Sequence, residues 1–156
     1  MASWAQFADA EPEFSARVLE LFTNYRHHTM ATVRRDGSPR ISGTEIALED
    51  GQLVLGMMPG TRRAADLRRD PRVAIHSHCV DPVEADPAAW PGEAKVSGRV
   101  VSGRGAPGPP APAEPTDADW FRVDLCAVVI TRLSEAADQL VIESWTPERG
   151  YREERR

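Results

Sequence analysis

The chain has 156 residues and a formal net charge of -5 at pH 7, from 24 acidic and 19 basic residues. This length suits a single domain with a sizeable core. The acidic balance argues against general affinity for nucleic acid or anionic membranes. The sequence shows neither an apolar run long enough to span a bilayer nor the start of a signal peptide. Two cysteines without CxxC spacing give no disulfide scaffold, so a cytoplasmic protein is expected.

The N-terminal segment, residues 1–28, is expected to be a helical lead. Pro12 is tolerated in the first turn of a helix, so a helix is predicted over residues 12–26. Its apolar residues recur at the helical period and would form one buried face: Phe14, Val18, Leu21, Phe22 and Tyr25.

Most of the remaining chain is typical of short strands joined by tight turns. Asp36-Gly37 and Asp50-Gly51 supply the Asp-Gly chemistry of hairpin turns. Strands are predicted at residues 29–34, 40–48, 52–58, 72–78, 94–101, 121–133 and 139–145.

Two stretches interrupt these strands. Residues 79–92 carry several chain-breaking dipeptides and predict a surface loop. Residues 102–117 are dominated by proline, glycine and alanine and are expected to form a mobile loop. Short antiparallel strands with a few helices predict a closed or nearly closed β-barrel, forming one domain over residues 1–156.

Residues 60–75 are the most informative stretch of the chain. They predict a short helix that begins at Thr61 and ends before Pro71, followed at once by a strand. The Thr61 hydroxyl can cap the helix by accepting from backbone N–H groups that have no partner inside it. Arg62 and Arg63 then lie in the first turn, where the helix dipole disfavours cations. A hydroxyl, free N–H groups and two guanidinium groups together indicate an anion site, most naturally for a phosphate.

The order of hairpin, strand, Gly-Thr-Arg-Arg helix and Asp-Pro-Arg-Val strand resembles the pyridoxamine 5'-phosphate oxidase-like flavin-binding split barrels. In that family a Ser-Arg-Lys-Ala run opens the helix, where this chain has Thr61–Ala64, and Asn-Pro-Arg-Val opens the next strand, where it has Asp70–Val73. The resemblance covers residues 29–74 well. It extends more loosely to Ile142–Trp145 and the arginine-rich tail. It implies a mostly β fold with two or more helices, a split β-barrel of the six-stranded antiparallel Greek-key type.

The resemblance also implies a homodimer that binds FMN in the groove between its subunits and acts on a small-molecule substrate. Trp145 and Arg155 would come from the partner subunit, Met57 would lie near the flavin ring, and Lys95 could stabilise negative charge on the reduced ring. The cofactor-binding residues implied are Arg40, Ser42, Met57, Thr61, Arg62, Arg63, Lys95, Trp145 and Arg155.

Four residues depart from the family pattern. Glu45 stands where many FMN-binding members have lysine, Gly56 and Met57 replace Tyr-Thr, and Glu93 replaces a glutamine. A carboxylate at Glu45 would repel a phosphate unless it points away or pairs with an arginine. Lys95 could compensate for the missing lysine. A deazaflavin, and less often haem, are the alternatives to FMN.

The four histidines raise the question of a metal. His76 and His78 share one face of a predicted strand beside Cys79, and His27-His28 precede the first strand. Zinc sites need three or four convergent ligands with support behind them, so no metal site is expected.

The sequence shows no serine triad spacing, nucleophile elbow or thiol–histidine signature. That absence is consistent with an enzyme whose cofactor supplies the reactive chemistry. The tail, residues 149–156, does not reproduce the arginine-and-histidine pattern of pyridoxamine 5'-phosphate oxidase itself. The prediction is therefore a flavin- or deazaflavin-dependent oxidoreductase; the alternative is a non-catalytic module that binds a cofactor or haem.

Overall fold

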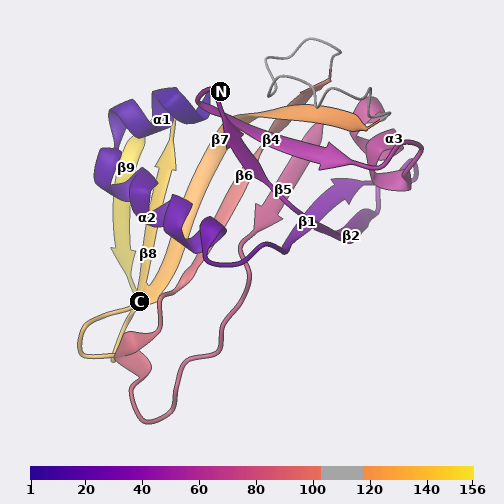
Figure 1. The fold of residues 1–156 in the computed structure, drawn as a ribbon. Helices are drawn as coiled ribbons and strands as arrows, with labels where there is room; N and C mark the ends of the chain where they lie inside the picture. The colour runs from indigo at the N-terminus through magenta and orange to yellow at the C-terminus, as the bar shows by residue number, and fades with distance from the viewer. Residues whose placement is uncertain (103–117) are drawn as a thin grey trace.

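A computed structural model describes residues 1–102 and 118–156 of the chain (Figure 1). The segment expected to be a mobile loop, residues 102–117, lies outside the described residues except for Ser102, which ends a strand. No helix in the described part is long and apolar enough to cross a membrane.

Two short helices precede the sheet. α1 (Trp4–Ala10) begins after Ser3, whose hydroxyl accepts from the Gln6 backbone N–H while the Gln6 side chain accepts from the Ser3 N–H. α2 (Pro12–Thr23) begins at its proline. Because a proline ring clashes with the carbonyl four residues earlier, one helix cannot run through both segments. The helix predicted over residues 12–26 is present and ends at Thr23.

The described strands form one nine-stranded sheet, and every pairing in it is antiparallel. The main order is β2-β1-β5-β6-β7-β4-β3, with β8 paired to β7 and β9 paired to β8. The strands are β1 (His28–Val33), β2 (Pro39–Thr44), β3 (Ala47–Glu49), β4 (Gln52–Met57), β5 (Arg72–His76), β6 (Glu93–Ser102), β7 (Asp119–Leu133), β8 (Leu140–Thr146) and β9 (Gly150–Arg155).

The long strand β7 explains why the sheet is split. Its first half pairs with β4, where Met57 faces Asp119, and its second half pairs with β8, where Trp145 faces Val128. β6 pairs along most of the opposite edge of β7. The sheet does not close on itself, so the expected mostly β split-barrel fold is confirmed.

Two strand assignments differ from the prediction by more than a shift of one or two residues at an end. The strand predicted over residues 40–48 is divided into β2 and β3, with Glu45 and Ile46 between them. The arginine-rich tail forms an ordered strand, β9, which pairs with β8 from Thr146–Gly150 to Val141–Arg155. Its four consecutive charged residues, Arg152 to Arg155, are exposed, so hydrophobic patterning did not mark it as a strand.

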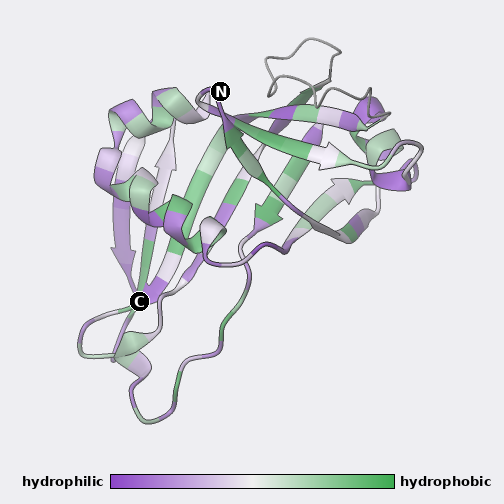
Figure 2. Cartoon of the chain, in the orientation of Figure 1, coloured by the Kyte–Doolittle hydropathy of each residue, from purple (hydrophilic) through white to green (hydrophobic). Residues whose placement is uncertain are grey.

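The hydrophobic core lies between the two N-terminal helices and the sheet. Phe7 on α1 stacks against Trp145 on β8, with ring centroids 4.7 Å apart, and meets Trp4 and Phe14 edge to face. Figure 2 shows hydrophobic residues concentrated on the central strands, whereas β9 is largely hydrophilic. The helices therefore cover the β7–β8 side of the sheet and leave the β2–α3 side to other contacts (Figure 1).

A buried carboxylate ties α2 to the C-terminal strands. Glu143 on β8 accepts two hydrogen bonds from Arg17, at 2.5 and 2.7 Å, one from Arg132 at 2.8 Å and one from the Tyr151 hydroxyl at 2.7 Å. Burial alone would raise the pKa of Glu143, but these hydrogen bonds outweigh it and lower the pKa to about 2. The carboxylate stays ionised and fixes β9 to the rest of the sheet.

Candidate functional site

α3 (Arg62–Arg69) begins as the sequence predicts. Thr61 has an extended backbone, and its hydroxyl accepts from the Ala64 N–H at 3.4 Å. The helix ends at Arg69, and Asp70, its C-cap, has an extended backbone before Pro71. Because Arg62 and Arg63 occupy the first turn, their backbone N–H groups have no acceptor inside the helix. An anion at this helix start would meet free N–H groups and the positive end of the helix dipole.

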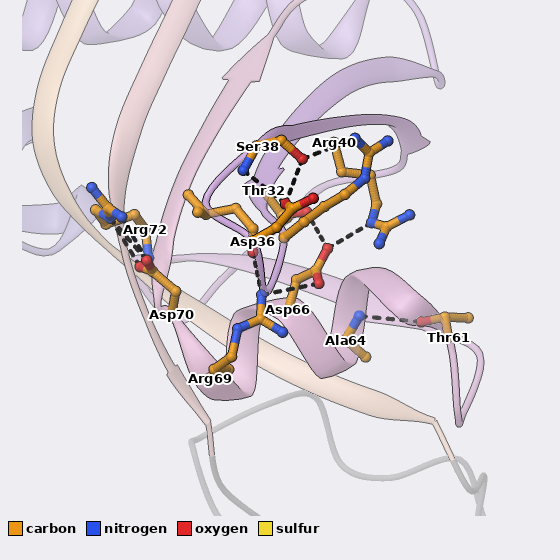
Figure 3. A network of polar contacts seen from close by, with 12 residues as sticks. Thr32, Asp36, Ser38, Arg40, Thr61, Ala64, Asp66, Arg69, Asp70 and Arg72 are labelled. Atoms are coloured by element: carbon orange, nitrogen blue, oxygen red, sulfur yellow. Dashed lines mark hydrogen bonds and ion pairs between the residues drawn. The ribbon is translucent and has the colours of Figure 1, made fainter.

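Asp66, one turn further along α3, joins the helix to the β1–β2 hairpin (Figure 3). Its buried carboxylate accepts from Arg40 Nε at 2.6 Å, from the Thr32 hydroxyl at 3.1 Å and from Arg69 at 3.1 Å. Burial by itself would raise the pKa of Asp66, and the hydrogen bonds from these three side chains lower it overall. Arg40 is therefore held in place by a carboxylate that stays charged.

Only one nitrogen of Arg40 is used in this way. Its Nε is bonded to Asp66, and within the described residues its two terminal nitrogens donate no hydrogen bond. The side chain is about 20 % exposed. Asp66 thus orients the guanidinium group through Nε. The two terminal nitrogens, which can bind a phosphate as a fork, stay available.

Arg63 and Ser42 complete the junction between β2 and α3. Arg63 donates from one terminal nitrogen to the Gly43 carbonyl of β2, whereas Arg62 is exposed. Ser42 lies two residues from Arg40 and so shares its face of the strand. The Ser42 hydroxyl and Arg63 Nε are both buried, and neither has a hydrogen-bond partner among the described residues. Two buried donors without an acceptor suit a bound anion, because leaving a buried polar group unpaired costs free energy.

A cleft of about 770 Å³ opens beside this junction. Its volume is within the usual range for a cofactor or small-molecule site. Arg63 of α3 also lines the cleft and so links the junction to the cleft wall. Met57, which the resemblance places near a flavin ring, lines the cleft as well. The residues that line the cleft include Gly43, Glu45, Gly56, Met57, Arg63 and Trp120.

Trp120 is a cleft residue that sequence reasoning missed. It pairs with Gly56 across β7 and β4, and a Cβ added at Gly56 would lie 2.8 Å from the indole ring. Gly56 therefore leaves room for an aromatic ring supplied by the neighbouring strand. The only available signal was an aromatic residue beside the proline-rich segment, and no local pattern shows which strand β7 will pair with.

Glu45 lies on the cleft wall but does not face it as an unpaired charge. Its carboxylate is 2.9 Å from Arg26 Nε and 3.8 Å from His27 Nδ1. The arginine pairing that would make this position compatible with a phosphate is therefore present. A second acid on the wall, Glu49, has its pKa raised by burial and then by the charge of Asp50, which favours its neutral form.

Three predicted cofactor residues lie away from the α3 junction in this chain. Lys95 on β6 is paired with Glu93 at 2.6 Å and does not line the cleft. Arg155 on β9 is about 56 % exposed and contacts Glu153 at 2.8 Å. Trp145 is 4 % exposed and packs against Phe7 in the core, so its side chain offers almost no surface to a second subunit. β8 and β9 lie on the opposite side of the molecule from α3 (Figure 1).

The model of the pyridoxamine 5'-phosphate oxidase family matches residues 14–105, more than half of the chain. The chain belongs to this family. The matched region contains the β1–β2 hairpin, the cleft-lining part of β4 and the whole of α3. No curated protein matches the sequence.

Solved structures share the fold at low sequence identity. A pyridoxamine 5'-phosphate oxidase-related, FMN-binding protein from Nostoc punctiforme is 12% identical with a TM-score of 0.62, over 94% of this chain and 95% of its own. PhzG from Burkholderia lata, in complex with tetrahydrophenazine-1-carboxylic acid, is 9% identical with a TM-score of 0.62, over 98% and 92%.

The haem storage protein HutZ from Vibrio cholerae is more distant in structure. It is 14% identical with a TM-score of 0.51, over 74% of this chain and 89% of its own. At these identities the three structures establish the fold alone. The ligand has to be argued from the residues of this chain.

Proposed function

We propose that this protein binds a phosphorylated flavin, FMN first, and acts as an oxidoreductase on a small molecule. The observation that carries the proposal is the pair of unpartnered buried donors at the β2–α3 junction, Ser42 Oγ and Arg63 Nε. They lie with the capped start of α3 and with Arg40, whose orientation is set by Asp66. A phosphate dianion would accept from all of these groups at once.

The cleft supports the placement of the flavin ring. Its lining is largely apolar, and it includes Met57, Val54 and the indole of Trp120. These side chains would hold a planar ring by packing and would exclude water from one of its faces. When bound, the flavin supplies hydride or electron transfer, and the protein supplies binding, orientation and electrostatics.

A homodimer is part of the proposal. Two large apolar side chains that line the cleft are exposed in the single chain, Met58 at 75% and Trp120 at 40%. Ile41 on β2 is 74% exposed. Exposed apolar surface beside a cleft is typical of an interface. A second subunit covering it would enclose the cleft. The family resemblance assigns Arg155, which is about 56% exposed on β9, to the cofactor of the neighbouring subunit.

Haem binding by a non-catalytic module is the second candidate. The observation in its favour is His27, which lines the cleft, has a side chain 77 % exposed, and offers an imidazole as an axial ligand. This reading makes no use of the unpartnered donors at α3. A deazaflavin is the alternative cofactor for the proposed oxidoreductase. The anion site would bind the phosphate ester of either cofactor and does not distinguish their ring systems.

The experiment is a fluorescence titration of the purified protein with FMN and, in parallel, with a deazaflavin and haemin. The double variant Arg62→Ala, Arg63→Ala should weaken FMN binding about 100-fold, because charge-assisted hydrogen bonds contribute about 1.5–3 kcal/mol each. The matched control is Arg34→Ala, Arg35→Ala, which removes the same charge from an adjacent pair in the β1–β2 turn.

The control pair should leave the FMN affinity within about twofold, because exposed charges without direct contact are screened. Equal losses in both double variants would contradict a local phosphate site. Haemin binding with a Soret band, abolished by His27→Ala and accompanied by no FMN affinity, would replace the first reading with the second.

A further inference from the structure

A cluster of metal-ligating side chains lies at the junction of β5 and β6, away from the cleft. His76 is the last residue of β5, Cys79 follows three residues later, and Glu93 is the first residue of β6. One imidazole nitrogen, the thiol sulfur and one carboxylate oxygen all lie within 4.8 Å of one another. None of the three residues lines the cleft proposed for the flavin.

The hydrogen bonds of His76 show which nitrogen is available. Nδ1 lies 2.8 Å from the Ser77 carbonyl oxygen, which can only accept, so Nδ1 carries the proton in the neutral ring. Nε2 then presents a lone pair, 3.4 Å from Glu93 Oε2. Two acceptors facing each other need a cation between them, either a proton on the ring or a metal ion.

Glu93 is oriented in the same manner. Its other oxygen, Oε1, accepts from Lys95 Nζ at 2.6 Å, so Oε2 is left directed at His76. Support of this kind, a carbonyl behind the imidazole and a donor behind the carboxylate, is typical of metal ligands.

The backbone at this junction is rigid. Ser77 is 1 % exposed; its N–H donates to the Ala94 carbonyl at 2.8 Å, and its hydroxyl accepts from the Ala94 N–H at 3.0 Å. These reciprocal bonds fix the end of β5 against the start of β6. Cys79 alone is exposed, on the loop, with Sγ 3.6 Å from His76 Nδ1.

We propose that His76 Nε2, Cys79 Sγ and Glu93 Oε2 bind one divalent transition-metal ion of the zinc class. Tetrahedral zinc with bonds of about 2.0–2.3 Å holds its ligand atoms roughly 3.3–3.8 Å apart, which the 3.4 Å between Nε2 and Oε2 already satisfies. Cys79 Sγ, which lies 3.6 Å from Nδ1 of the same imidazole and within the 4.8 Å cluster, is the third ligand. An imidazole, a thiolate and a carboxylate favour zinc over the hard cations Mg²⁺ and Ca²⁺.

Three protein ligands leave a fourth position for water or for a small ligand, as in catalytic zinc sites. Neither neighbouring histidine belongs to the set: His78 stacks on Tyr25 with ring centroids 4.2 Å apart, and His28 is buried against Phe22. Residue spacing along the chain did not suggest the site, because Glu93 is brought to His76 only by the pairing of β5 with β6.

The test is a titration of the untagged protein with Zn²⁺ against a chromophoric chelator, and with Co²⁺ read by absorption. The expected result is one metal ion per chain and a thiolate-to-cobalt charge-transfer band. Cys79→Ser should abolish that band, and Cys79→Ser, His76→Gln and Glu93→Gln should each weaken Zn²⁺ binding at least tenfold. Cys126→Ser and His78→Gln are the matched controls and should bind as the parent does.

Binding no tighter in the parent than in a variant that combines Cys79→Ser, His76→Gln and Glu93→Gln would overturn the proposal. Loss of the cobalt band in Cys126→Ser in place of Cys79→Ser would overturn it as well. The FMN titration of Cys79→Ser should match that of the parent protein, so this proposal can fail while the flavin proposal stands.

Discussion

Asp66 and Glu143 are two buried carboxylates with nearly the same set of partners. Each accepts from two arginines and one hydroxyl: Asp66 from Arg40, Arg69 and Thr32, and Glu143 from Arg17, Arg132 and Tyr151. Their side chains are 5% and 2% exposed. Asp66 lies beside the proposed anion site (Figure 3). Glu143 is a residue of β8 and joins that strand to Tyr151 of β9.

The two clusters differ in which arginine nitrogens are occupied. At Glu143, both terminal nitrogens of Arg17 donate to the carboxylate as a fork. At Asp66, Arg40 donates through Nε, and its terminal nitrogens have no partner in the described part of the chain. A buried ion pair can therefore close a fold or orient a binding group, and the nitrogen that is engaged distinguishes the two roles.

The largest expected effect is on stability at Glu143. Glu143→Gln leaves two arginines facing a neutral group and should lower the free energy of unfolding by about 3 kcal/mol, the lower end for a broken buried pair because both arginines are partly exposed. Urea unfolding measures it. Glu154→Gln, at an exposed pair with Arg156, is the control and should change stability by less than about 0.5 kcal/mol. If Glu143→Gln lowered the free energy of unfolding no more than Glu154→Gln does, the Glu143 cluster would not stabilise the fold.

Asp66→Asn should affect both stability and binding. We expect a loss of about 2 kcal/mol in unfolding free energy, together with FMN binding about tenfold weaker because Arg40 is no longer held in place. Glu143→Gln should leave the FMN affinity within about twofold in the same titration. If both variants bind FMN equally well, Asp66 does not orient a cofactor ligand and the contrast between the clusters fails.

Acid should act through Glu143 in a defined range. The pKa of Glu143 is about 2 in the folded chain, against an ordinary value of 4.5, so its ionised form stabilises the fold above pH 4.5. That contribution should be lost as the pH falls from about 4.5 to about 2. Urea unfolding across this range should show a steeper fall in stability for the parent than for Glu143→Gln. Parallel curves would contradict the assignment.

The smallest expected effect is at Arg155, which is exposed and remote from α3 within its own chain. Arg155→Ala should leave the unfolding free energy within about 0.5 kcal/mol and weaken FMN binding about threefold, as one exposed charge contact from a second subunit would. Arg156→Ala is the neighbouring control. Equal affinity in parent and variant would remove Arg155 from the site but not the anion junction at α3.

Local patterns predicted much of the secondary structure. Apolar runs between turn residues marked β4 and β7, and the Thr61 hydroxyl with Pro71 bounded α3 to within a residue. Local patterns did not predict the elements whose conformation is set by contacts with residues distant in sequence. The break at Glu45 and Ile46 and the solvated strand β9 have no hydrophobic signature of their own.

The residues of the candidate site also fall into those that local sequence could predict and those that depend on tertiary contacts. Arg62 and Arg63 could be proposed as anion ligands because a helix start with a capping hydroxyl and two arginines has a physical meaning without any further context. Arg40 was proposed only from the family resemblance. The roles of Trp120 and Glu93 could not be read, since each depends on a strand partner distant in sequence. The burial of Trp145 is likewise a consequence of α1 folding over β8.

The amino-acid sequence by itself determined the capped basic helix, most of the strands and the family resemblance, because caps, turns and periodicity act over a few residues. Only the tertiary structure decided that Asp66 holds Arg40 by one nitrogen, that Arg26 neutralises Glu45, and that His76, Cys79 and Glu93 converge. These contacts depend on strand register and helix docking, which join residues far apart along the chain.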